Sequence, residues 1–207
     1  MIQVPEIADE HVKELTMIIC PESKPIYVNV EPESFAEVNE CFPAIEKKIE
    51  RDDGSRVLGW QIWKTKILID AEFHAIWKST VGELIDITPK QILFQKILFL
   101  PDSKAKYDGV QVDNIRLNIS GNRLVDDFIE IAKAIYRMEN KGERAFQYEV
   151  SFSGSESQIY QNLKKIQAGV YSMIQNGKSR NSPCFCNSRS KYKHCCRELI
   201  SKQLKSL

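Results

Sequence analysis

The stretch RVLGWQIWKTKILIDAEFHAIWKS, residues 56–79, decides the fold of this chain. It contains two consecutive runs, 56–65 and 66–79, in which β-branched, aromatic and aliphatic residues dominate. A third run of this kind, 83–87, follows after the short turn at 80–82. We therefore predict that these three runs form an antiparallel meander.

Further elements are expected on both sides of the meander, because apolar residues recur there at helical or strand spacing. The resulting fold class is α+β, a largely antiparallel sheet with packed helices. The expected elements are a short helix within 1–20, a strand at 27–30, a helix at 39–49, strand-like runs at 92–100, 110–119 and 145–152, and amphipathic helices at 122–138 and 155–175.

The composition indicates a protein with a substantial core and an uneven charge distribution. The chain has 207 residues, of which 43% are apolar, and no apolar run approaches the length of a membrane span. The net charge is only +1, but residues 177–207 contain eight Lys/Arg and one acidic residue. The tail is thus formally +7 and the rest −6. Because no signal peptide is visible, we expect a cytoplasmic location.

Four cysteines in this basic tail form two close pairs, Cys184 with Cys186 and Cys195 with Cys196. Four soft thiolate ligands suit tetrahedral zinc, so the spacing predicts one structural Zn²⁺ site. The alternative is a pair of disulfides or free thiols. We favour the metal because a cytoplasmic chain keeps its thiols reduced.

The residues around these pairs, Arg180-Asn-Ser-Pro183 and Lys191-Tyr-Lys193, resemble the SEC-C motif, a small zinc-binding tail first known from the SecA translocation ATPase. The resemblance implies that the last two ligands are the cysteines themselves and not the preceding His194. It also implies a protein partner for the tail. The chain has Phe185 and Asn187 where the motif usually has Pro and Gly, and Asn tolerates the left-handed backbone that Gly supplies.

A nucleic acid is a second candidate partner, since clustered cations attract phosphate. The tail offers only Phe185 and Tyr192 for stacking on bases and contains no recognised groove-reading helix. We therefore favour a protein partner.

Outside the tail, Cys41, His74 and Asp86 suggest a thiol site. Cys41 lies in the first turn of a predicted helix, where the helix dipole favours a thiolate. His74 and Asp86 lie on consecutive predicted strands, and a hairpin through Gly82 would bring them to one face. Asn39 is the candidate oxyanion donor beside the Cys41 backbone N–H.

The segments EFHAIW, residues 72–77, and GELIDITP, residues 82–89, are similar to the His and Asp strands of transglutaminase-like and papain-like proteins. The resemblance implies that Cys41 is a nucleophile, His74 its base and Asp86 the group that orients the imidazole.

Each of these residues also has a structural interpretation. Cys41 could be a small buried hydrophobe, His74 a hydrogen-bonded core residue, and Asp86 a cap of the following turn. Asp70 and Glu72 are competing partners for His74, because they lie on the same face of an ideal strand.

We thus expect a main domain, 1–176, and a zinc-binding tail, 178–207. The leading functional hypothesis is a cysteine hydrolase or acyltransferase of the acyl-transfer and amide-hydrolysis class. The alternative is a non-catalytic adaptor whose main domain and tail each bind a protein. Mutation of Cys41 separates the two, because only an enzyme depends on its thiol.

Overall fold

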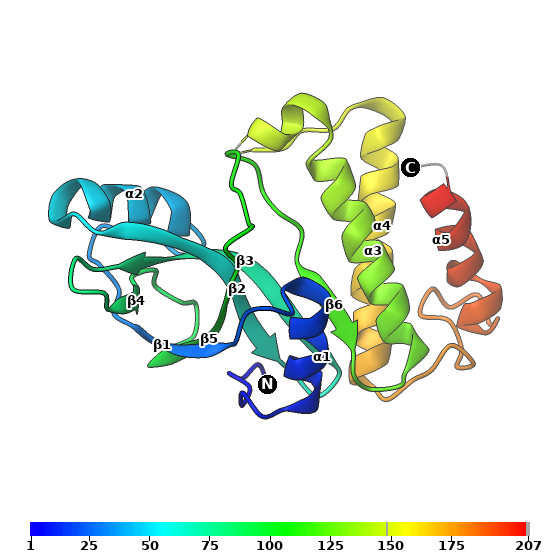
Figure 1. The fold of residues 1–207 in the computed structure, drawn as a ribbon. Coiled ribbons are helices and arrows are strands. Elements are labelled where there is room, and N and C mark those ends of the chain that lie inside the picture. Colours follow the sequence, from blue (N-terminus) through cyan, green and yellow to red (C-terminus); the bar gives the residue numbers. More distant parts are fainter. Residues whose placement is uncertain (148, 206–207) are drawn as a thin grey trace. The chain divides into compact units, whose positions relative to one another are not determined.

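The computed structural model describes residues 1–147 and 149–205 (Figure 1). Contacts within the chain define two compact units. The N-terminal unit comprises residues 1–107 and 114–119, and the C-terminal unit comprises 108–113 and the residues from 120 onward. The division at residue 176 that we expected from the sequence remains a prediction, but by contacts the two long helices belong with the cysteine tail.

The N-terminal unit contains a closed barrel of five strands. The strand order is β2-β5-β1-β4-β3, and β2 pairs with β3 to close the barrel. All of these pairings are antiparallel except that of β1 with β4, and β6 extends the sheet beside the start of β3. The elements are α1 (Glu10–Ile19), β1 (Ile26–Val30), α2 (Cys41–Asp52), β2 (Ser55–Lys64), β3 (Leu68–Lys78), β4 (Leu84–Asp86), β5 (Lys96–Pro101) and β6 (Ile115–Asn118).

Two apolar clusters lie on opposite faces of β3, because successive side chains of a strand point to opposite sides. One cluster fills the barrel interior and contains Val28, Trp63, Ile76, Ile97 and Phe99. The other joins α2 to the outer face of the barrel and contains Cys41, Ala44, Ile45, Ala75, Trp77 and Ile87. The strand β3 is therefore covered on both sides.

The C-terminal unit is helical. The helices α3 (Arg123–Glu139) and α4 (Gly154–Gln175) run side by side, and α5 (Cys196–Lys205) contacts both (Figure 1). Two short 3-10 helices complete the unit, η1 (Gly142–Phe146) and η2 (Tyr192–His194). Asn122 caps α3 by accepting a hydrogen bond from the backbone N–H of Leu124.

The prediction of the meander and of the two long helices is confirmed. The prediction of a strand at 145–152 is wrong. Its first two residues belong to η1, none of its described residues forms a strand, and α4 begins at Gly154. Residue 148 lies outside the described residues. The run at 110–119 forms a strand only in its second half. The helix predicted at 39–49 begins at Cys41 and ends at Asp52.

Candidate functional site

The four tail cysteines lie on one short hairpin, residues 180–196, which we call the cysteine hairpin. Its backbone pairs through hydrogen bonds from the N–H of Cys184 to the carbonyl of Ser190 and from the N–H of Tyr192 to the carbonyl of Ser182, each 2.9 Å. The turn between them contains Asn187 with φ 60°. Asn187 thus adopts the left-handed backbone that asparagine tolerates. The pairing brings both cysteine pairs to one end of the hairpin.

The four Sγ atoms of Cys184, Cys186, Cys195 and Cys196 all lie within 4.8 Å of one another. In a tetrahedral zinc site with Zn–S bonds of about 2.3 Å, sulfurs are roughly 3.8 Å apart. The Sγ atoms of Cys186 and Cys195 are 3.4 Å apart. The donor set therefore fits a tetrathiolate metal site, with Cys184 and Cys196 buried and Cys186 exposed.

Local electrostatics differ across this cluster. Hydrogen bonds from the side chain and backbone of Ser188 lower the pKa of Cys186 to about 6. Burial raises the pKa of the Cys196 thiol. A metal ion that binds here must therefore displace a firmly held proton from Cys196, whereas Cys186 is already inclined to be a thiolate.

Residues 180–198 match the family model of the SEC-C motif. The match covers the cysteine hairpin and the first turn of α5 and leaves the rest of the chain unassigned. No curated protein and no solved structure matches the chain. The resemblance of the main domain to transglutaminase-like or papain-like proteins is therefore not shown, and the SEC-C motif with its cysteine cluster indicates metal binding.

His194 lies outside the donor set. Its side chain is 64% exposed, and its Nδ1 lies 3.8 Å from Oε1 of Glu198. Within residues 1–147 and 149–205, the one cluster of potential metal ligands contains the four cysteines and no histidine.

The second region that the sequence singled out lies in the barrel. His74 and Asp86 are both buried, and Nε2 of His74 lies 3.1 Å from Oδ1 of Asp86. His74 also lies beside the ring of Phe99, a residue of the interior cluster. The predicted proximity of the two side chains is therefore present, inside the barrel.

Lys90 completes this buried group, and the sequence analysis missed it. Its Nζ lies 2.6 Å from Oδ2 of Asp86, 2.7 Å from Oε1 of Gln61 and 3.4 Å from Nε2 of His74. Hydrophobic periodicity does not indicate that a lysine after a turn points inward. The one signal in the sequence is that Lys90 follows Pro89 and lies only four residues after Asp86, which keeps the two side chains within reach of each other.

Charge keeps this group ionised. Burial by itself lowers the pKa of His74, but the carboxylate of Asp86 outweighs burial and raises that pKa to about 9. Burial by itself raises the pKa of Asp86, and His74 with Lys90 lowers it to about 2. At neutral pH the pair is an imidazolium and a carboxylate.

Cys41 occupies a different environment. It is the first residue of α2 and is 5% exposed within the outer cluster, beside Ala75 and Trp77. Ala75 and Trp77 of β3 lie in the same cluster as Cys41, whereas Ile76, between them, lies in the interior cluster. Because side chains alternate along a strand, His74 is on the face of Ile76. The structure thus brings His74 and Asp86 together. It places Cys41 in the outer cluster, where no hydrogen bond to His74 is found among the described residues, but near enough that a charge on its thiol contributes to the raised pKa of His74.

Of the remaining candidates, Asp70 and Glu72 have partners other than His74. Asn39 has a left-handed backbone, φ 68°, two residues before α2. The amide Nδ2 of Asn114 donates to Asp70, and Nε1 of Trp63 donates to Glu72. Asp86 also accepts from the backbone N–H of Thr88 at 3.0 Å, which is the turn-capping role that we gave as its structural interpretation.

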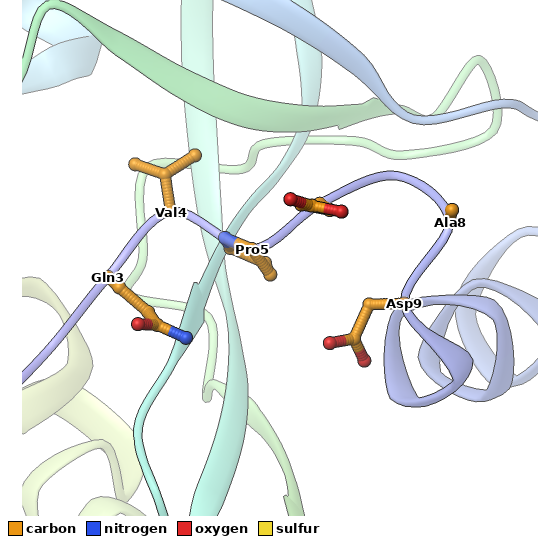
Figure 2. A pocket seen from close by; sticks show the side chains of 6 residues that line it. Gln3, Val4, Pro5, Ala8 and Asp9 are labelled. Carbon is orange, nitrogen blue, oxygen red and sulfur yellow. The ribbon is translucent and has the colours of Figure 1, made fainter.

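A surface hollow of about 430 Å³ lies elsewhere in the N-terminal unit. Figure 2 shows that its lining comes from one continuous segment, Gln3 to Asp9, and it includes none of the predicted site residues. Asp9 in this segment forms an ion pair with Lys64. None of the helices in the described ranges has the length and apolar character needed to cross a membrane.

Proposed function

We propose that this protein is a cytoplasmic, non-catalytic adaptor whose C-terminal unit is stabilised by one structural Zn²⁺. The observation that carries the proposal is the convergence of four cysteine Sγ atoms within 4.8 Å of one another. Four thiolates leave no open coordination position, which is the arrangement of structural rather than catalytic zinc. Zinc is the metal because soft thiolate ligands and a tetrahedral set favour it in a reducing compartment.

The partner surface of this adaptor is the basic face of the cysteine hairpin, where Arg189, Lys191 and Lys193 are exposed. These cations fit an acidic protein segment. A nucleic acid fits less well, because both candidate stacking residues are occupied: Tyr192 is fully buried, and Phe185 packs against Gly169.

Fluorescence anisotropy with a labelled acidic peptide and a labelled single-stranded oligonucleotide of equal charge tests this choice. We expect the zinc-loaded protein to bind the peptide, and Lys191→Glu with Lys193→Glu to weaken binding about tenfold. The matched control is Lys164→Glu with Lys165→Glu, which changes the same charge at exposed positions of α4. Binding of the oligonucleotide alone, or equal effects of both double variants, would contradict the proposal.

A thiol enzyme is the second candidate, and the 3.1 Å contact of His74 with Asp86 is what favours it. Cys41 also begins a helix, where a thiolate is stabilised. Catalysis would require Cys41 and His74 to reach each other from opposite faces of β3, so the adaptor is our first proposal.

The rate of Cys41 alkylation by iodoacetamide, followed by peptide mass spectrometry across pH, distinguishes the two. The adaptor predicts slow labelling that His74→Ala does not change. Rapid labelling well below pH 8 that is lost in His74→Ala would instead establish an activated thiol and support the enzyme. Cys20, buried in the same unit, is the internal reference.

A further inference from the structure

Asp127 on α3 is a fully buried carboxylate that binds the first residue of the cysteine hairpin, Arg180, and the residue directly after it, Arg197. It is 0% exposed. Its Oδ2 accepts from Nε of Arg180 at 2.8 Å, and its Oδ1 accepts from Nη2 of the same residue at 2.5 Å. Nε of Arg197 lies 2.6 Å from Oδ1. Two guanidinium groups therefore share one buried carboxylate.

The positions of these arginines connect the carboxylate to the metal ligands. Arg180 lies four residues before Cys184, and Arg197 directly follows Cys196. Each arginine thus anchors the chain on one side of the four cysteines. Because both bind the same side chain, Asp127 holds together the two ends of the segment that carries the cysteines.

The charge arrangement favours a positioning role. Arg197 also contacts Glu130, through Nη2 to Oε2 at 3.1 Å, so two carboxylates of α3 face two guanidinium groups. A buried ion pair contributes little net stability compared with apolar packing. It fixes geometry nevertheless, because separating the partners would leave a buried charge without compensation. Bidentate arginine contacts add directional specificity.

A second contact, independent of charge, seats the hairpin on α4. The Cβ of an alanine at position 169 would lie 2.6 Å from Cγ of Phe185 and closer still to the edge of the ring. Glycine in a helix interior is unfavourable for the helix itself, so Gly169 accommodates the ring that lies between Cys184 and Cys186. Phe185 occupies the place where the SEC-C motif usually has Pro.

We propose that Asp127 is a positioning residue of the metal centre, which couples metal binding to the packing of α3 and α4. This inference rests on the proposed metal binding. We call Asp127 together with Arg180 and Arg197 the clamp. The clamp holds the two cysteine pairs close enough for one ion, and the ion in turn holds the two arginines on Asp127. By thermodynamic linkage, metal stabilises the helical unit by the same factor by which the clamp raises metal affinity.

Competition with a chromophoric zinc chelator tests the inference on the full-length protein. Asp127→Asn should lower zinc affinity by about 10- to 100-fold, the range typical of residues that orient metal ligands. Gly169→Ala should also lower zinc affinity, although alanine is the better helix former. Glu143→Gln, which removes an exposed carboxylate from the same unit, and Ser172→Ala on α4 should leave the affinity unchanged.

Thermal unfolding followed by circular dichroism gives a second readout. Zinc should raise the Tm of the wild type by clearly more than it raises the Tm of Asp127→Asn, and a purely structural carboxylate would leave that increment unchanged. Equal zinc affinity in the wild type, Asp127→Asn and Gly169→Ala would overturn the inference while leaving metal binding intact. A wild type that binds no metal would instead overturn the proposed function.

Discussion

His74 Nε2 lies 3.1 Å from Asp86 Oδ1 in the interior of the N-terminal barrel, and both side chains are buried. The pair links two strands that are consecutive in sequence, and Lys90 joins it from the following loop. Its charges give the barrel a specific dependence on pH.

Stability should fall as the pH rises from about 6.5 to about 9. The pKa of His74 is about 9 in the folded barrel and lies near its ordinary 6.5 in the unfolded chain, so the folded state holds the proton more tightly over this range. At the acid end, the pKa of Asp86 is about 2, so stability is present above about pH 4 and is lost as the pH falls towards 2. Each arm amounts to on the order of 2–3 kcal/mol. Urea unfolding between pH 2 and pH 9.5 measures both losses of stability, and His74→Gln should remove the loss on the alkaline side.

Lys90→Met should destabilise the barrel, because Asp86 and Gln61 lose a buried donor. We expect a loss of about 1–3 kcal/mol, less than for a wholly broken buried pair because His74 still contacts Asp86. Lys66→Met, at an exposed position between β2 and β3, is the matched control. A loss no larger than that of the control in urea unfolding would show that Lys90 contributes little.

Gly59→Ala tests the close passage of β2 along β5. A Cβ at this position would lie 2.6 Å from Cζ of Phe99 and would also press on the backbone carbonyl of Leu100. Phe99 is fully buried and the carbonyl belongs to the paired strand, so neither yields easily. We expect a loss of about 2 kcal/mol or more in the free energy of unfolding. Thr80→Ala, in an exposed turn, should change it little.

Asn187→Gly should be tolerated, because glycine adopts the φ of 60° at least as readily as asparagine. Asn187→Val should weaken zinc binding, since a β-branched residue is strained in the left-handed region and the turn between the cysteine pairs must shift. Chelator competition measures both variants. Equal zinc affinities for Gly and Val at this position would mean that the turn does not constrain the ligands.

Local patterns were sufficient to predict much of this structure. Hydrophobic periodicity identified α3 and α4, and the short turn after Ser79 identified the β3–β4 hairpin that brings His74 to Asp86. Cysteine spacing alone indicated the metal ligands that the structure clusters.

Other features depend on contacts between distant residues, which local patterns do not specify. Closure of the barrel requires the parallel pairing of β1 with β4 and the antiparallel pairing of β2 with β5. The amino-acid composition of a strand does not determine which other strand it pairs with. The same limit applies to Asp127, which reads as one acidic residue of an amphipathic helix although 53 positions separate it from Arg180. It applies also to Cys41, whose place in the outer cluster depends on how α2 docks on β3.

Metal content after purification in zinc-supplemented medium tests the central claim most directly. We predict one zinc ion per chain in the wild type and in Cys20→Ser with Cys41→Ser, and a loss of zinc in Cys184→Ser with Cys196→Ser. Elemental analysis of monodisperse protein gives the ratio. Zinc that persists without the tail cysteines, or a wild type that contains no zinc and takes up none after reduction, would contradict the account.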